Sequence, residues 1–212
     1  MNHQPLKYDK YYHIYNRGIN GCSIFRHTDN YEHFLNLYDK YITPVAKTYA
    51  WVLMNNHFHF LVKIKSENEI YNSNNLEGFR NLQGLKNRNR VNQQFSNLFN
   101  AYSKAFNKRY KRTGSLFEHP FKRIPINSLA HLKYLIYYIH HNPVHHGFCE
   151  AMIEYPWSSY LTILSPKETK LSRNEVLKWY KSQQHYKEYH SSESIDKFVD
   201  IQIDLPFTLT NP

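Results

Sequence analysis

The segment at residues 57–64, HFHFLVKI, keeps one face of an extended chain apolar from end to end. Every second residue is large and hydrophobic, namely Phe58, Phe60, Val62 and Ile64. A period of two is that of a β-strand, in which successive side chains point to opposite faces. The pattern therefore predicts a strand whose phenylalanine face packs under helices and whose other face carries two histidines.

Four segments have the composition of β-strands. They are rich in Tyr, Ile, Val and Phe and are bounded by Gly, Pro or Asn: residues 10–17, 48–54, 57–64 and 115–126. Asn55-Asn56 lies between the second and third segments and is a turn signal, which predicts a hairpin. Pro120 interrupts the fourth segment and cannot donate a ladder hydrogen bond, so we expect an edge strand or a bulge there.

Three segments have apolar residues at helical spacing: residues 31–42, 95–106 and 128–141. Ser128 is the expected N-cap of the third helix, and Pro143 and Gly147 are expected to stop it. The order β-α-β-β-α-β-α predicts an α+β protein with a ferredoxin-like four-stranded antiparallel sheet. Two helices would cover one face of the sheet, and the third helix has the opposite face available.

The chain divides by composition into one domain and two polar segments. We expect the domain over residues 1–160, interrupted by an Asn-rich insertion or loop at 66–94. Residues 161–212 are polar and weakly helical, and we expect them to form a C-terminal extension.

The charge balance favours a polyanionic partner. The 27 Lys and Arg against 17 Asp and Glu give a formal net charge of +10, and the pI is near 9.4. The chain also has 19 Tyr and 13 Phe. Most of these rings are expected in the core, but rings beside cations also suit the stacking of unpaired bases.

Features of other protein classes are missing from the sequence. The two cysteines, Cys22 and Cys149, form no CxxC pattern and suit a reducing compartment. There is no run of about 18 apolar residues and no apolar N-terminal signal region. We therefore expect a cytoplasmic protein that does not interact with a membrane.

His57 and His59 are the first candidates for chemistry. Two residues apart on a strand, they project from the same face, roughly 6–7 Å apart at the backbone. Both imidazoles could then converge on one cation. An HxH pair by itself equally fits two partly exposed histidines on a solvated strand face.

Tyr138 and Asn142 are the second candidates. Four residues apart on a helix, they share a face and lie about 6 Å apart along the axis. Taken alone, Asn142 also fits a helix C-terminus before Pro143, and Tyr138 fits an aromatic stripe with Tyr134 and Tyr137.

The two pairs together predict a metal site beside a phenol nucleophile. Two neutral histidines and one amide oxygen would hold Mg²⁺ or Mn²⁺ weakly until a phosphate oxygen completes the shell. The metal would polarise a DNA phosphate, and attack by the tyrosine would leave a 5′-phosphotyrosine link and a free 3′-OH. The bond energy is retained, so the strand could be rejoined elsewhere.

Several motifs carry a resemblance to a known family. NHFHFLV at 56–62 resembles the histidine-hydrophobe-histidine motif of the HUH endonuclease superfamily. YIHHNPVHHG at 138–147 resembles the catalytic-helix segment of REP-associated tyrosine transposases, which are relatives of small insertion-sequence transposases. Shorter matches cover about residues 8–160: YHIYNRG at 12–18, RTGSLFEHPFK at 112–122 and YPWSSY at 155–160.

The resemblance implies roles for individual residues. Tyr138 would be the nucleophile, and His57, His59 and Asn142 would be the metal ligands. It also implies Mg²⁺ or Mn²⁺ as cofactor and single-stranded DNA with a hairpin as partner. Relatives act as monomers or as homodimers, and both remain open here.

Basic and polar residues near these motifs are the expected DNA contacts, although each also fits a solvated surface group: Asn16, Arg17, Lys108, Arg109, Lys111, Arg112, Lys122 and Arg123.

Three other interpretations remain open. Tyr102 could be the nucleophile, although it lies among phenylalanines and has Phe106 in place of a ligand four residues later. The chain could be a non-catalytic DNA-binding module derived from a transposase. It could also be a zinc hydrolase in which His57 and His59 recruit a third ligand, with four histidines near in sequence: His140, His141, His145 and His146.

Overall fold

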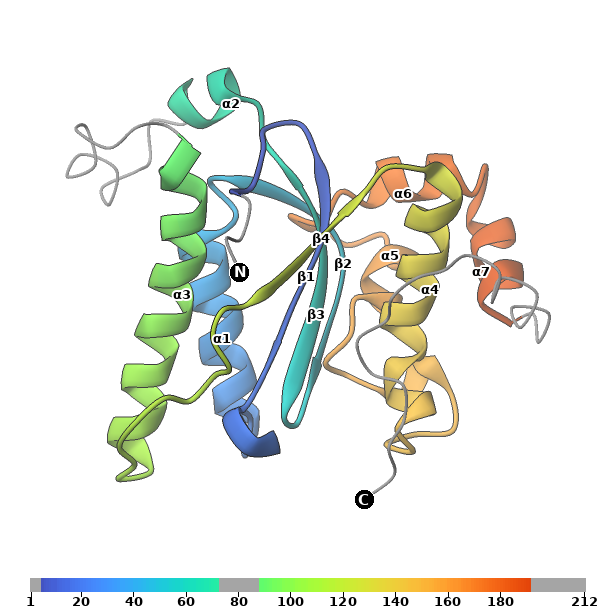
Figure 1. The fold of residues 1–212 in the computed structure, drawn as a ribbon. Helices are drawn as coiled ribbons and strands as arrows, with labels where there is room; N and C mark the ends of the chain where they lie inside the picture. The colour runs from blue at the N-terminus through green and yellow to red at the C-terminus, as the bar shows by residue number, and fades with distance from the viewer. Residues whose placement is uncertain (1–4, 73–87, 192–212) are drawn as a thin grey trace.

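A four-stranded antiparallel sheet forms the centre of the molecule (Figure 1). The structure is a computed structural model that describes residues 5–72 and 88–191. The strands lie in the order β2-β3-β1-β4, and each pairs antiparallel with its neighbour. Their bounds are β1 Tyr11–Arg17, β2 Ala46–Met54, β3 His57–Ile64 and β4 Lys122–Ile126. The predicted four-stranded antiparallel sheet is confirmed, with the predicted hairpin between β2 and β3.

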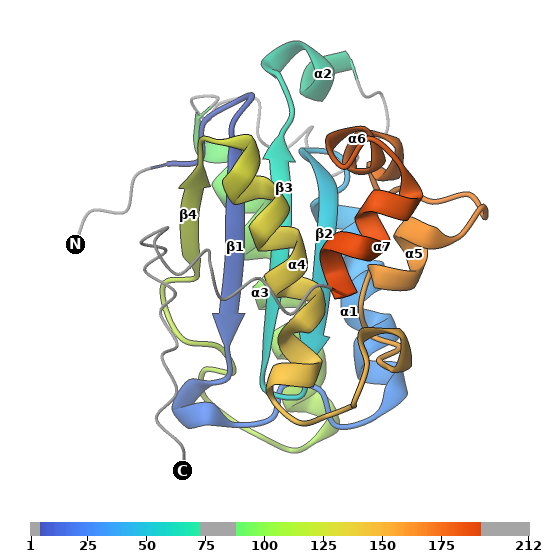
Figure 2. The ribbon, with the colours of Figure 1, turned by 90° about the vertical axis from the view of Figure 1, so that its right-hand side faces the viewer.

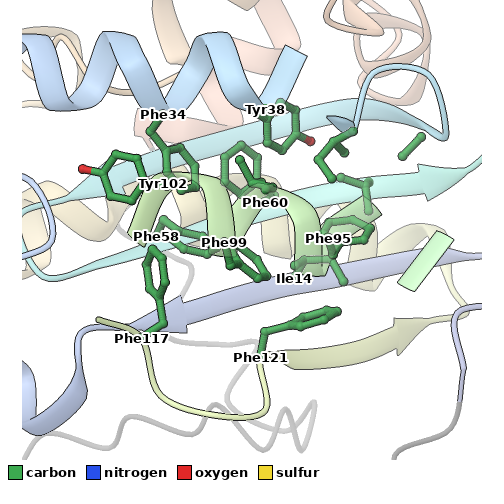
Figure 3. Packing of buried hydrophobic residues seen from close by; sticks show 14 of the residues in the cluster. Ile14, Phe34, Tyr38, Phe58, Phe60, Phe95, Phe99, Tyr102, Phe117 and Phe121 are labelled. Carbon is green, nitrogen blue, oxygen red and sulfur yellow. The ribbon is translucent and has the colours of Figure 1, made fainter. Parts of the chain in front are cut away.

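The phenylalanine face of β3 packs under two helices, as the alternation predicts (Figure 3). Phe58 and Phe60 are 1% exposed, and Val62 and Ile64 are fully buried. The covering helices are α1, Thr28–Tyr41, and α3, Arg88–Arg109. A short helix, α2, Glu67–Asn72, follows β3, and a 3-10 turn, η1, Ile19–Gly21, follows β1.

The opposite face of the sheet is covered by α4, Leu129–His145 (Figure 2). Ser128 is its N-cap as expected, and its hydroxyl accepts a hydrogen bond of 3.2 Å from the backbone N–H of His131. Leu135, Ile136 and Ile139 are buried against Leu61 of β3 and residues of β2. The two sides of the sheet therefore carry separate hydrophobic cores.

The expectation that Pro143 stops this helix was wrong. Pro143 lies inside α4, and the backbone N–H of His146 still bonds to the carbonyl of Asn142 at 3.0 Å. The helix ends at His145, with His146 as its C-cap, and Gly147 follows with a φ of 69°. Gly147 donates to Val144 and Phe148 donates to Pro143, both at 2.9 Å, which is a Schellman ending.

The fourth strand is shorter than predicted. Of residues 115–126, only Lys122–Ile126 pair as a strand with β1. Phe117 forms an isolated bridge with Gly18, and Glu118 donates to the carbonyl of Arg17 at 3.0 Å. The chain before Pro120 thus closes the end of β1 and does not extend the sheet.

The segment after residue 160 adds helices to the α4 side of the sheet. These elements and the 3-10 turn before them are η3 Met152–Glu154, α5 Tyr160–Leu164, α6 Arg173–Trp179 and α7 Gln183–Ser191. Val176, Tyr180 and Tyr186 belong to the same buried cluster as the core of α4. This part of the expected extension therefore packs into the second core.

The predicted polar insertion at 66–94 is only partly described. Its ends lie in α2 and in the first turns of α3, and residues 73–87 are outside the described residues. Among the described residues, no helix combines the length and apolarity needed to cross a membrane.

Candidate active site

The register of β1 against β3 places two rows of side chains on the face under α4. Tyr15 is paired with His59, and Arg17 is paired with His57. Residues directly opposite each other in an antiparallel ladder project from the same face. Both histidines therefore face α4, while Phe58 and Phe60 face the other core.

Helix α4 brings Tyr138 and Asn142 to this pair. The Oδ1 atom of Asn142 lies 3.1 Å from Nε2 of His57. The ring of Tyr138 meets the ring of His59 edge to face, with centroids 5.5 Å apart. The structure thus brings together all four residues predicted for the metal and nucleophile positions.

The two nitrogens of His57 both face amide oxygens. Nδ1 lies 2.7 Å from Oδ1 of Asn56, and Nε2 faces Asn142. The orientation of Asn56 follows from its own amide group, which donates to the carbonyl of Gly21 at 3.4 Å. Burial lowers the pKa of His57 to about 4, with the Asn142 contact opposing the shift, so the ring is neutral at pH 7.

A neutral imidazole has one N–H, which Asn56 can accept at Nδ1. Nε2 of His57 then presents a lone pair toward the oxygen of Asn142. These two acceptor atoms, 3.1 Å apart, repel each other unless a cation lies between them or the Asn142 amide is rotated so that its NH₂ group faces His57. With a cation, Asn56 would be the outer partner that orients a metal-ligating histidine.

Among the described residues, His59 and Asn142 each have a buried polar atom with no hydrogen-bond partner. These atoms are Nε2 of His59 and Nδ2 of Asn142. Burial lowers the pKa of His59 well below its usual value, so its imidazole is neutral at pH 7. An unpartnered buried polar group is costly, by about 1–3 kcal/mol, unless a ligand or water meets it.

The ligand atoms of this site fit a weakly held divalent cation. His57 and His59 supply neutral nitrogens, and Asn142 supplies a carbonyl oxygen. In the part of the chain that the structure describes, Nε2 of His59 has no hydrogen-bond partner. The set has no carboxylate, so substrate oxygens would have to supply the negative charge that Mg²⁺ or Mn²⁺ prefers. Within residues 5–72 and 88–191, no three His, Cys, Asp or Glu side chains group as a metal site.

Tyr138 is a protonated phenol in this environment. Burial raises its pKa above the usual value of 10, and the contact with the Asn142 side chain opposes the shift. Tyr15, beside it on the sheet, has a pKa raised to about 12 by burial and by Tyr138. A phenolate at Tyr138 therefore needs a nearby positive charge or a base.

The predicted DNA contacts on β1 have different surroundings. Asn16 is only 4% exposed, accepts from the backbone of Arg17 and donates to the carbonyl of Glu118 at 3.2 Å. Asn16 therefore holds the end of β1 and is not placed to meet DNA, contrary to expectation. Arg17 is half-buried beside His57 and pairs with Glu118 at 3.2 Å.

The two predicted contacts on β4 point to opposite sides of the sheet. Lys122 is exposed and is paired with Tyr15, so it lies on the face of the two histidines. Arg123 lies on the other side, with its guanidinium 4.2 Å from the centroid of the Phe121 ring. It also donates to Asn92 of α3 at 3.0 Å.

The predicted basic cluster at the end of α3 belongs to the other helical layer. Lys108 and Lys111 are exposed. Arg109 forms an ion pair with Asp29, and Arg112 donates to Asn107 at 3.0 Å. In Figure 1 this end of α3 points toward the same end of the molecule as the β2–β3 hairpin.

Sequence reasoning missed His13, which is buried beside His59. Nε2 of His13 lies 2.9 Å from Nδ1 of His59. The signal that could have found it is the alternation of the first strand, in which His13, Tyr15 and Arg17 share one face. His146 was considered only as a zinc ligand, and its ring lies 5.2 Å from that of His57.

Tyr102, the alternative nucleophile, lies on the far side of the sheet. It is 1% exposed among the phenylalanines of the first core, as Figure 3 shows, and its hydroxyl donates to the carbonyl of Ile24 at 2.5 Å. The structure therefore does not bring it to the histidine pair.

The histidines considered for a zinc site are only partly near His57. His140 is fully buried on the other side of α4, where it contacts Ser159 at 2.8 Å and His190 at 3.2 Å. His141 stacks on Tyr137, and His145 is exposed. The third ligand that the zinc interpretation needs is not supplied by His140 or His141.

One solved structure matches the chain over most of its length. It is the structure of a REP-associated tyrosine transposase bound to a REP hairpin, with a TM-score of 0.50 and 14% sequence identity. The match covers 78% of this chain and 87% of that one. The chain shares the fold of this transposase. No family model matches the sequence, and no curated protein matches it.

Proposed function

We propose that the chain is a metal-dependent single-strand DNA endonuclease and strand transferase. It would be a single-tyrosine transposase that cuts beside DNA hairpins and forms a 5′-phosphotyrosine intermediate. The observation that carries the proposal is the convergence of His57 and His59 from β3 with Asn142 and Tyr138 from α4. The ferredoxin-like strand order and the role of α4 as the catalytic helix are parts of the same proposal.

His57, His59 and Asn142 would hold Mg²⁺ or Mn²⁺ at the end of the sheet nearest the β2–β3 hairpin. A bound divalent ion supplies Lewis-acid polarisation of a phosphate oxygen. Because the three side chains are neutral, the site would fill most readily when DNA supplies a phosphate oxygen. Metal and DNA binding would then be coupled.

Tyr138 would attack the scissile phosphorus in line with the departing 3′ oxygen. A Tyr138 Oη–P bond forms, the P–O3′ bond breaks, and the phenolic proton ends on the 3′-OH, directly or through water. One phosphodiester replaces another, so the reverse step can join the 5′ end to a different 3′-OH. This exchange needs no external energy source.

The DNA backbone would cross the exposed side of the histidine row. Lys122 lies in the cross-strand row of Tyr15 and His59, and Arg17 lies in the row of His57. Cations at these positions would hold phosphates on either side of the cut, and the net charge of +10 supports the same partner. The similar transposase is bound to a REP hairpin, which motivates hairpin DNA as the substrate.

One chain is enough to assemble the proposed site. His57, Asn142 and Tyr138 meet within a single molecule. We therefore propose that a monomer can cut DNA, and that a homodimer would be needed only for joining two ends.

The test is covalent capture of DNA. A labelled single strand with a hairpin is incubated with protein and Mn²⁺, and a protein–DNA adduct is sought on a denaturing gel. We expect an adduct with the unmodified protein and with Tyr134→Phe, a matched control one turn earlier on α4. We expect none with Tyr138→Phe.

Two outcomes would overturn the proposal. Normal hairpin binding without any adduct under Mn²⁺ would indicate a non-catalytic hairpin DNA-binding protein derived from a transposase. Strand cleavage with Zn²⁺ and no protein–DNA link would indicate a hydrolase.

A further inference from the structure

His13 is a buried histidine that the proposed mechanism does not use. It is 2% exposed, lies on β1 at the centre of the sheet, and touches His59, which is 1% exposed. Nε2 of His13 and Nδ1 of His59 are 2.9 Å apart. The rings are nearly parallel, at 26°, with centroids 5.1 Å apart.

Both rings lie in the protein interior, where a charged imidazolium is disfavoured: His13 is 2% exposed and His59 is 1% exposed. A contact of 2.9 Å between two neutral imidazoles needs one N–H between the nitrogens, so one ring donates and the other accepts. The direction of this hydrogen bond decides which tautomer His59 adopts.

The two directions have opposite consequences for the candidate metal site. If His13 donates, Nδ1 of His59 accepts and the proton of His59 sits on Nε2, which becomes a buried donor without a partner in the described chain. If His59 donates from Nδ1, its Nε2 has a free lone pair. Only the second direction leaves an atom of His59 that can bind a cation.

We propose that His13 is a positioning residue that accepts the Nδ1–H of His59 and so directs the Nε2 lone pair of His59 into the metal site. This inference rests on the proposed function for its metal. The strand pairing holds the two rings in a fixed position relative to each other, because His13 and His59 lie on the adjacent central strands β1 and β3. Asn56 would do the same for His57, so each histidine would have its own oxygen or nitrogen acceptor.

The acceptor role can be separated from simple packing by a set of His13 variants. Gln places a carbonyl oxygen about where Nε2 of His13 lies, so His13→Gln can still accept from His59. Asn is polar but one carbon shorter and cannot reach, and Leu fills space without accepting. Tyr12→Phe changes the same strand on the opposite face and is the matched control.

Mn²⁺ affinity is one readout, measured by electron paramagnetic resonance titration in the presence of hairpin DNA. Losing the outer partner of a metal ligand typically weakens metal binding about 10–100-fold. We expect a loss of that order in His13→Asn and His13→Leu. His13→Gln and Tyr12→Phe should stay within a few-fold of the unmodified protein.

The tautomer of His59 is a second readout, and it needs neither metal nor activity. Imidazole ¹⁵N shifts of the metal-free protein should show the proton of His59 on Nδ1, and His13→Gln should keep it there. A proton on Nε2 in the unmodified protein would overturn the inference. So would unchanged Mn²⁺ affinity in folded His13→Asn and His13→Leu.

The two proposals fail in different ways. If the unmodified protein captures DNA and His13→Asn binds Mn²⁺ as tightly, the role of His13 is wrong and the function stands. If the Nδ1–H tautomer is observed but no Mn²⁺ binds with or without DNA, the proposed function is wrong. Circular dichroism establishes that each variant is folded before either conclusion is drawn.

Discussion

His57 and Asn142 are 85 residues apart in the chain, yet Nε2 of the histidine lies 3.1 Å from Oδ1 of the amide. The contact joins the start of β3 to the last turns of α4. It forms because Leu135, Ile136 and Ile139 bury α4 against the same sheet face. The second core therefore decides the geometry of the candidate site.

Substitution of Asn142 tests the ligand set directly. Asn142→Ala removes the amide oxygen, and we expect Mn²⁺ affinity in the presence of hairpin DNA to fall about tenfold or more. Asn142→Asp adds a negative charge, so Mn²⁺ should bind more tightly without DNA. The same carboxylate beside Tyr138 disfavours its phenolate, so covalent capture should slow. Calorimetric titration and the capture gel measure the two effects. Unchanged Mn²⁺ affinity in Asn142→Ala would remove this residue from the site.

Tyr102 and Tyr138 should separate stability from activity. Tyr102→Phe loses a hydrogen bond to the carbonyl of Ile24, which is expected to lower the free energy of unfolding by about 1 kcal/mol. Its adduct yield should match that of the unmodified protein, since its ring lies in the other core. Urea unfolding and the capture gel test the pair. Loss of the adduct in folded Tyr102→Phe would restore it as the candidate nucleophile.

Lys122 and Arg123 are adjacent cations on opposite faces of the sheet. Lys122→Ala should remove one phosphate contact and reduce the salt slope of single-strand binding by about 0.7. Arg123→Ala should leave that slope unchanged and should lower the free energy of unfolding instead. The reason is that Arg123 packs over the ring of Phe121 and donates a hydrogen bond to Asn92. Binding isotherms at several salt concentrations distinguish them. Equal loss of slope in both variants would contradict the assigned faces.

Acid should weaken the packing of α7 on α4. His190 is buried against His140, and burial lowers its pKa from 6.5 to about 4. The unfolded chain therefore binds this proton more readily than the folded one. Stability is full above pH 6.5 and falls as the pH drops from 6.5 toward 4, by about 3 kcal/mol for a fully buried group.

Urea unfolding at pH 7, 5.5 and 4.5 measures this loss. His190→Gln should be less stable at pH 7 but should lose less stability on acidification than the unmodified protein. His185→Gln, at an exposed position, should show the same loss as the unmodified protein. A pH dependence unchanged in His190→Gln would mean that other groups cause it.

A buried and an exposed phenylalanine should differ in the stability lost on truncation to alanine. Phe58 is 1% exposed and packs against Phe34 and Phe99, with ring centroids 5.2 and 5.6 Å away. Phe58→Ala should cost about 3–5 kcal/mol. Phe148 is 52% exposed, and Phe148→Ala should change stability by less than about 0.5 kcal/mol. Thermal and urea unfolding measure the stability of each variant. Equal stability of Phe58→Ala and Phe148→Ala would contradict this packing.

Local periodicity was enough to predict much of the site. Alternation along residues 57–64 places His57 and His59 on one face whatever the strand pairs with, because it follows from backbone geometry. Helical spacing likewise puts Tyr138 and Asn142 on one face. Both features belong to single elements, and the structure has them as the sequence predicts.

Contacts between elements were decided only by the tertiary structure. The pairing register of β1 sets His13 beside His59, and the burial of α4 sets Asn142 beside His57. The same distant packing turned Asn16 inward and carried α4 past Pro143 to His145. Such choices depend on apolar surface that residues far apart in the chain bury together, which no local pattern contains.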